Sequence, residues 1–356
     1  MKKRESLVLI GFAYLLLSAS IPFSPAQAAG GPTPQNPLIL TYEFWLSNKV
    51  GSWPYVESYF KKLEEITGGA VKMEYHTGGA LGKPDEIYER TLRGVNNIGH
   101  FPPGYTPGVF PMFEMFELPI HFPTAETLTH AALAMNDKGY FKKDFSNVKL
   151  LSMYSNGPWV LYLTKDKVTT VDGLKGLKLN SASEGWVKVS KLLGATPVSI
   201  FPAEHYSALQ KGIMDGLWQL WDATLVYKMN EVCKYVNEVL FGTLMHVSAM
   251  NIDTWNKLPD VAKAYLESNF KTFSLEQSKR ISRLDGSRKA FLSTPSNEIY
   301  SFSKEEMAKL SQRLTPITAE WIAAREAKKL PAKQAIVDLD QILKSRPPSR
   351  ILGYTR

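Results

Sequence analysis

The stretch over residues 168–221 constrains the fold most, because strand-like and helix-like patterns alternate within it. Leu177-Lys178-Leu179 reads as a short strand, and residues 186–193 after it read as an amphipathic helix. Residues 196–200 read as a second strand, and a second helical pattern then leads to Trp218 and Trp221. Strands that alternate with helices in this way predict a parallel α/β sheet.

The first 28 residues have the pattern of an export signal. Three basic residues precede an apolar run over residues 7–21, and Ala26 and Ala28 satisfy the small-residue rule for cleavage. The apolar run is shorter than the roughly 20 residues that a membrane-spanning helix needs. We therefore predict a cleaved signal peptide and a product that is released into the periplasm.

Charge and cysteine content exclude other classes of protein. The formal net charge of +8 is spread along the chain without a basic run, so nucleic acid is not an expected partner. The single cysteine, Cys233, cannot form an internal disulfide, and we expect a buried, inert thiol. The six histidines show no metal-ligand spacing, and we expect neither a metal nor a cofactor.

Several motifs occur in the order and spacing of one protein family. They are LKGLK at 174–178, LGATP at 193–197 and YSALQKGIMDG at 206–216, with FELPIHF at 116–122 upstream. Each motif alone is weak, but together they resemble the solute receptors of tripartite ATP-independent periplasmic (TRAP) transporters, the DctP type. The resemblance covers nearly all of the chain after the signal.

The resemblance implies an α/β fold of two lobes, the periplasmic binding protein fold of type II-like form, with a long helix that spans both lobes. We expect that helix over residues 260–291, where apolar residues recur at helical spacing after Pro259. Pro316 is expected to break a later helix. The implied domains are the signal peptide 1–28, the N-terminal part of the first lobe 29–153, the second lobe 154–242, the return to the first lobe with the long helix 243–300, and C-terminal helices 301–356.

The function that the resemblance implies is solute capture rather than catalysis. Such a receptor encloses a small organic solute, here an organic acid, between its lobes and delivers it to the membrane permease subunits. We expect a monomer or a homodimer.

Aromatic and amide residues gather near predicted strand and loop ends, where open α/β sheets bind ligands. Tryptophan is also a common core residue, so each of these residues has an alternative role in packing. The candidate ligand contacts are Trp45, Phe101, Tyr105, Asn156, Trp159, Asn180, Trp186, Trp218, Gln219 and Trp221.

Asn180 stands where the resemblance implies an arginine that clamps a ligand carboxylate, and Trp159 also replaces a basic position. One explanation is that another cation holds the carboxylate, with Arg90, Arg93 and Lys49 as candidates. The other is that the solute has an aromatic or otherwise apolar body, which stacks on rings and forms neutral hydrogen bonds. We favour the second explanation.

Two other functions stay open at this point. The receptor of an ATP-driven (ABC) importer shares the architecture but not this order of motifs. A penicillin-binding type of serine acyltransferase would use the S-x-x-K motif at 58–61, with Tyr154-Ser155-Asn156 as its Y-x-N partner. The lysine-threonine-glycine strand of such enzymes is missing from the sequence.

Overall fold

The computed structural model describes residues 31–181, 183–281 and 284–354, so the expected signal peptide lies outside the described residues. The described residues from Pro32 onward form one compact unit. No helix in the described ranges combines the length and the hydropathy needed to cross a bilayer.

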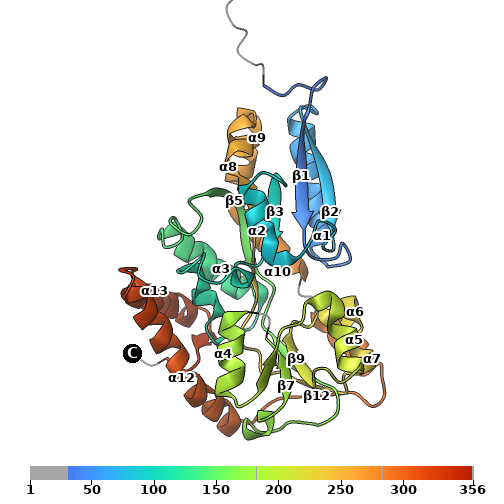
Figure 1. The fold of residues 1–356 in the computed structure, drawn as a ribbon, viewed down its shortest axis with the longest axis vertical. Coiled ribbons are helices and arrows are strands. Elements are labelled where there is room, and N and C mark those ends of the chain that lie inside the picture. The colour runs from blue at the N-terminus through green and yellow to red at the C-terminus, as the bar shows by residue number, and fades with distance from the viewer. Residues whose placement is uncertain (1–30, 182, 282–283, 355–356) are drawn as a thin grey trace, which may run out of the picture. The chain divides into compact units, whose positions relative to one another are not determined.

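The first of two main sheets is built mostly from the N-terminal part of the chain (Figure 1). Its strand order is β2-β1-β3-β11-β5, in which β1 pairs in parallel with β2 and β3, and β11 pairs antiparallel with β3 and β5. The strands are β1 (Leu38–Phe44), β2 (Val71–Thr77), β3 (Ile98–Phe101), β5 (Val148–Ser155) and β11 (Met245–Asn251). Helices α1 (Trp53–Ile66), α2 (Ile87–Leu92), α3 (Ala125–Asp137) and α10 (Phe270–Ile281) pack on them.

The second sheet contains the alternating strands and helices that the sequence predicted, and this prediction is confirmed. Its order is β12-β10-β6-β9-β7-β8, with β7 parallel to both β8 and β9. The strands are β6 (Val160–Leu163), β7 (Lys178–Asn180), β8 (Thr196–Val198), β9 (Gly216–Gln219), β10 (Tyr235–Asn237) and β12 (Glu298–Tyr300). The helices between them are α4 (Glu184–Leu192), α5 (His205–Gln210), α6 (Ala223–Tyr227) and α7 (Met229–Val232).

Two extended connections join the sheets, and they run antiparallel beside each other. Residues 156–159 lead from β5 to β6, and residues 238–244 lead from β10 back to β11. The backbone N–H of Asn156 donates to the carbonyl of Leu244 at 3.3 Å, and that of Trp159 donates to the carbonyl of Gly242 at 3.1 Å. The two connections are therefore tied to each other.

The long helical segment expected after Pro259 is present, but it is not one helix. It consists of α9 (Asp260–Ser268), α10 and α11 (Leu284–Leu292), and it follows α8 (Ile252–Lys257). Asn269 ends α9, because its side-chain amide donates to the carbonyl of Tyr265 at 2.9 Å. Since α10 packs on β5 of the first sheet and α11 packs on α6 and α7, which lie between strands of the second sheet, the segment contacts both lobes.

Two C-terminal helices, α12 (Lys304–Glu326) and α13 (Ala332–Lys344), pack on each other, with α12 also on α4 and α13 on α3. The expectation that Pro316 breaks α12 is wrong. Leu310, Leu314 and Ile317 are buried at helical spacing on both sides of the proline, so packing outweighs the hydrogen bond that it removes. A further two-stranded sheet pairs β4 (Ile120–His121) with β13 (Arg350–Ile351).

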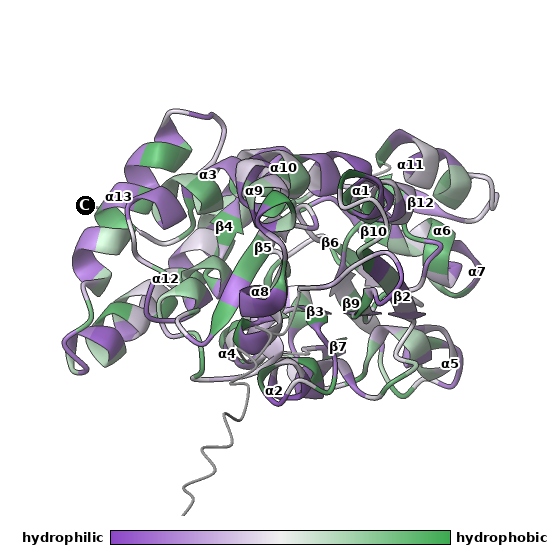
Figure 2. Cartoon of the chain, turned by 90° about the horizontal axis from the view of Figure 1, so that it is seen from above, coloured by the Kyte–Doolittle hydropathy of each residue, from purple (hydrophilic) through white to green (hydrophobic). Residues whose placement is uncertain are grey.

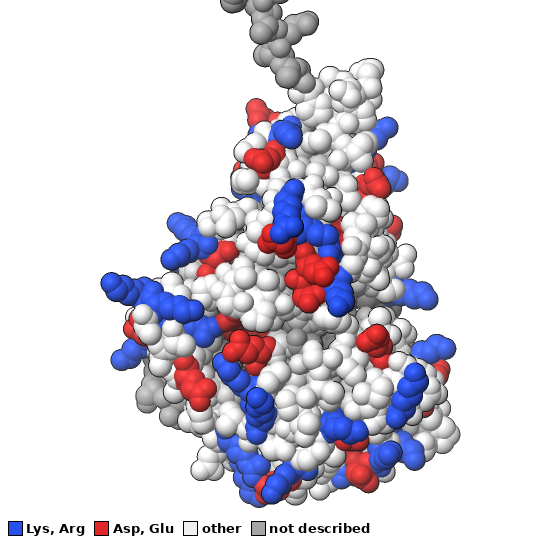
Figure 3. Space-filling model, viewed as in Figure 1, with Lys and Arg blue, Asp and Glu red and all other residues white. Residues whose placement is uncertain are grey.

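Hydrophobic residues lie along strands such as β5, while hydrophilic residues cover outer helix faces (Figure 2). Basic and acidic side chains are interspersed over the face drawn in Figure 3. Cys233 is buried, which raises its thiol pKa above the ordinary value, as expected for an inert thiol.

Candidate functional site

A cavity lies between the two sheets; about 540 Å³ of space in it holds no protein atoms, and this figure includes space open to solvent. Residues from both sheets, from the two connections and from α10 form its walls. The lining residues are Trp45, Leu46, Val50, Tyr105, Asn156, Trp159, Asn180, Pro202, His205, Trp218, Gln219, Leu220, Asp222, Ala223, Val226, Tyr227, Leu244, His246 and Ile281.

The cavity brings together seven of the ten residues that sequence reasoning singled out. These seven are Trp45, Tyr105, Asn156, Trp159, Asn180, Trp218 and Gln219. They come from segments as far apart in the chain as Trp45 and Gln219, and those of the second sheet meet the first sheet where β5 and β9 end and β6 begins.

The other three lie behind the cavity wall, in the core. Phe101 is buried against Tyr88 and Phe110. Trp186 is buried because it is on the inner face of α4, and Trp221 turns away from the cavity, where its indole N–H donates to Glu238 at 3.0 Å. Aromatic character in the sequence did not show which of these residues line the cavity and which pack in the core.

Trp186 nevertheless supports the wall. Its ring stacks on Trp159, with ring centroids 4.6 Å apart, and lies 5.6 Å from the ring centroid of Trp218. The two lining indoles are thus held by a third, fully buried indole. A change that displaces Trp186 should therefore alter the cavity wall.

Two histidines that the sequence did not single out, His205 and His246, also line the cavity. Burial lowers the pKa of His205 to about 4 and that of His246 to about 3, so both imidazoles are neutral near pH 7. His246 Nδ1 lies 3.4 Å from the indole nitrogen of Trp45, which donates to it, and the two rings stack at 5.6 Å. No sequence spacing indicated either histidine.

The side chain of Asn180 lines the cavity and also makes hydrogen-bond contacts within the protein. Its side-chain oxygen accepts from the backbone N–H of Ile200 at 3.0 Å, and its amide nitrogen lies 3.1 Å from His205 Nε2. These contacts hold the end of β7 to the segment that follows β8.

We expect Asn180→Ala to lower the free energy of unfolding by about 1 to 2 kcal/mol, because the Ile200 N–H loses its partner. Urea unfolding measures this difference. Asn256→Ala is the control, since Asn256 is exposed on α8. Equal stability of the two variants would contradict a structural bond at Asn180.

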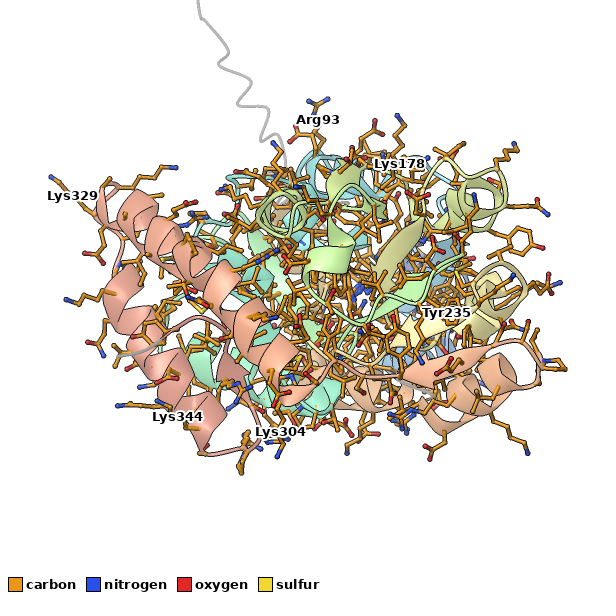
Figure 4. All side chains as sticks on the ribbon, turned by 90° about the horizontal axis from the view of Figure 1, so that it is seen from below. Arg93, Lys178, Tyr235, Lys304, Lys329 and Lys344 are labelled. Atoms are coloured by element: carbon orange, nitrogen blue, oxygen red, sulfur yellow. The ribbon has the colours of Figure 1, made fainter. Side chains whose placement is uncertain are left out.

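The three cations proposed as substitutes for the missing arginine do not line the cavity. Arg90 is bonded to Glu43 and Glu86, and Arg93 is bonded to Glu89 and is 71% exposed. Figure 4 shows Arg93 pointing away from the body of the protein. Lys49 is exposed. Among the described lining residues there is no lysine or arginine, and Asp222 contributes a buried carboxylate.

The amides of the wall present donors rather than acceptors. The side-chain oxygen of Asn156 accepts from the N–H of Leu244 at 3.3 Å and from the hydroxyl of Thr243 at 3.1 Å. The side-chain oxygen of Gln219 accepts from the N–H of Leu220 at 2.9 Å. Because the oxygens are used in this way, the amide NH₂ groups are what Asn156 and Gln219 offer to a ligand.

The residues of the suggested acyltransferase motifs differ in accessibility. Ser58 and Lys61 are exposed on α1, whereas Tyr154 and Asn156 are buried. Tyr154 bonds to His100 through its hydroxyl at 2.8 Å. These residues therefore form no common pocket. Across the residues that are described, no cluster of three histidine, cysteine, aspartate or glutamate side chains could hold a metal ion.

Two α/β lobes joined by paired connections, with a cavity between them, define a two-lobed solute-binding protein of the kind that closes on its ligand by hinge motion. Residues 53–324 match the DctP family, described as bacterial extracellular solute-binding protein, family 7. The chain therefore belongs to this family, and its resemblance to TRAP receptors is confirmed.

Individual relatives agree with this assignment. The chain is 25% identical over 317 residues to the C4-dicarboxylate-binding periplasmic protein DctP of Rhodobacter capsulatus, covering 88% of this chain and 92% of that one. A TRAP periplasmic solute-binding protein of Desulfovibrio salexigens superimposes with a TM-score of 0.77 at 25% identity, covering 90% and 98% of the two chains. A marine metagenome TRAP solute-binding protein in complex with 3-hydroxybenzoate superimposes with a TM-score of 0.79 at 23% identity. The match covers 87% of this chain and 99% of that one. The family favours the TRAP receptor over the ABC importer receptor.

Proposed function

We propose that the protein is the extracytoplasmic receptor of a TRAP-type secondary transporter for an organic acid with an aromatic or otherwise apolar body. The observation that carries this proposal is the composition of the cavity wall. Three tryptophans, Trp45, Trp159 and Trp218, supply ring faces, while the described lining residues include no lysine or arginine. Such a wall favours ring stacking and neutral hydrogen bonds.

A relative of known ligand supports this class of solute. The marine relative was solved with 3-hydroxybenzoate, an aromatic acid, whereas the Rhodobacter relative is named for C4-dicarboxylates. The wall of this chain, rich in indoles, fits the aromatic acid better.

We propose that the seven lining residues identified from the sequence contact the solute, and that the lobes close over it by bending at the paired connections. The loaded receptor then docks on the permease subunits. We further propose cleavage after residue 28, a periplasmic location, and action as a monomer or homodimer.

Calorimetric titration at low and high salt tests the solute class. We expect 3-hydroxybenzoate to bind with less than about threefold change in Kd between about 20 mM and about 500 mM NaCl, because screening acts chiefly on pairs of charges. Binding should also quench or shift the tryptophan fluorescence, and Trp218→Phe should reduce that signal. Trp255→Phe is the control, because Trp255 is on α8 and outside the wall.

Succinate is the comparison ligand in this experiment. Tight, strongly salt-dependent binding of succinate, without binding of 3-hydroxybenzoate, would overturn the aromatic class and leave a receptor for dicarboxylates. Failure of the protein to bind any small acid would count against the receptor function itself.

A further inference from the structure

In the described part of the chain, four buried side-chain nitrogens without a hydrogen-bond partner belong to the wall of the cavity between the lobes: Trp159 Nε1, His205 Nδ1, Trp218 Nε1 and His246 Nε2. Among the described residues, other such atoms lie outside this wall, Trp186 Nε1 among them. Buried polar groups in folded proteins are nearly always bonded, because leaving one unpaired is costly. The four nitrogens in one wall indicate that a ligand supplies the missing partners.

The protonation state of His246 follows from its neighbour Trp45. An indole N–H can only donate, so His246 Nδ1, 3.4 Å from Trp45 Nε1, must accept and carry no proton. The ring is neutral, since burial holds its pKa at about 3. The remaining proton is therefore on Nε2, which is a donor at the cavity wall.

Stacking fixes the orientation of the His246 ring. The Trp45 ring lies on one side, with an angle of 10° between the planes, and the His100 ring stacks with centroids 5.2 Å apart at 12°. The Tyr154 ring also stacks on His246, with centroids 5.2 Å apart. His246 itself is on β11, which pairs with a strand on each side. The direction of its Nε2–H bond is thus set before a ligand arrives.

The two indole donors come from other parts of the fold. Trp159 is on a connection between the sheets, and Trp218 is on β9 of the second sheet. Both rings pack on Trp186, and neither indole nitrogen can accept a hydrogen bond. Three neutral donors thus come from the first lobe, the connection and the second lobe.

We propose that His246 Nε2 and the indole nitrogens of Trp159 and Trp218 form a neutral donor set that binds the carboxylate of the solute, and that Trp45 is the positioning residue that sets the tautomer of His246. This proposal rests on the proposed receptor function and names the groups that replace the missing arginine clamp. A carboxylate accepts several hydrogen bonds at once, so one group satisfies donors from both lobes. Binding is thereby coupled to closure of the lobes.

The first test uses 3-hydroxybenzoate as the probe in calorimetry. His246→Leu removes the donor and should weaken binding by about 5- to 150-fold. His246→Gln is the matched control, since its amide nitrogen takes the place of Nε2, and it should stay within about tenfold of the unaltered protein. Thermal unfolding of each variant establishes that it is folded before titration.

The second test measures the tautomer directly in the ligand-free protein. Two-bond ¹H–¹⁵N correlation spectra of the unaltered protein should show His246 protonated at Nε2 alone. Trp45→Phe retains a stacked ring but removes the N–H, so the His246 signals should shift toward a mixture of tautomers, with a smaller loss of affinity than in His246→Leu.

Three results would overturn the proposal: protonation of His246 at Nδ1, equal binding of 3-hydroxybenzoate by His246→Leu and His246→Gln, or no binding of this probe by the unaltered protein. In each case the receptor function could still stand, because binding of another small acid such as succinate would show a working receptor with a different clamp. Absence of binding for all acids would instead reject the receptor function.

Discussion

Gly242→Ala is expected to lower the free energy of unfolding by about 2 to 5 kcal/mol, which is a large change at a single methyl group. Gly242 has a φ of +70°, a conformation that costs other residues about 1 to 2 kcal/mol. An added Cβ would also overlap the indole of Trp186, lying 2.6 Å from its Cη2 atom. Overpacking of this kind costs roughly a further 1 to 3 kcal/mol.

The same change should weaken solute binding, because Trp186 supports the rings of Trp159 and Trp218. Gly286→Ala is the control: Gly286 is in α11, and the nearest atom to its added Cβ is Leu225 Cδ1 at 4.0 Å. The free energy of unfolding of Gly286→Ala should rise by up to about 1 kcal/mol. Urea unfolding and calorimetry on both variants measure these effects. Gly242→Ala with unaltered stability would show that the contact with Trp186 is not rigid.

Glu117→Gln is expected to stabilise the protein by about 2 to 3 kcal/mol at about pH 8, and by less than about 1 kcal/mol at about pH 5. Glu117 ends the short helix η3 (Phe113–Glu117), and its carboxylate accepts from the hydroxyl of Ser183 at 2.5 Å. Gly104 and Gly185 pack so closely on it that an added Cβ at either would collide with Glu117.

Burial raises the pKa of Glu117 from 4.5 to about 7; the Ser183 hydrogen bond opposes this rise, and the charge of Glu114 adds to it. Because the folded-state pKa is above the unfolded one, the protonated acid is favoured in the fold. Its stabilisation is complete below about pH 4.5 and is lost as pH rises through about 7. Glutamine imitates the neutral acid and so avoids this loss.

Thermal or urea unfolding at the two pH values measures the difference. Glu57→Gln, at an exposed position of α1, is the control and should change stability by less than about 0.5 kcal/mol at either pH. A gain for Glu117→Gln that is equal at both pH values would contradict a carboxyl that titrates near neutrality.

The local part of the fold could be predicted from the sequence, because its signals are local. The turn at Gly176, which has a φ of +81°, precedes β7, where the sequence predicted a strand over residues 177–179. The prediction failed at two places for different reasons. Asn269 ends α9 through a local side-chain bond to Tyr265, whereas Pro316 is tolerated within α12 because tertiary packing buries its neighbours.

The site could be predicted only in part. Aromatic residues at strand ends indicated a ligand cavity, but not which rings face it. Trp186 became core because α4 turns it inward, whereas Trp159 and Trp218 in front of it form the wall. His246 was missed, since its role depends on Trp45, 201 residues away in the chain. Such long-range pairs leave no periodic trace in a sequence.

The two paired connections also limit how the lobes can move. Connections tied by hydrogen bonds from Asn156 to Leu244 and from Trp159 to Gly242 resist sliding past each other. In the bending motion that we propose, Asn156, Trp159 and Leu244 lie at these connections and also line the cavity, so we expect them to move less relative to one another than Trp45 and Trp218 do. The proposal then implies that a solute contacts the residues of the connections before the two lobes close on it.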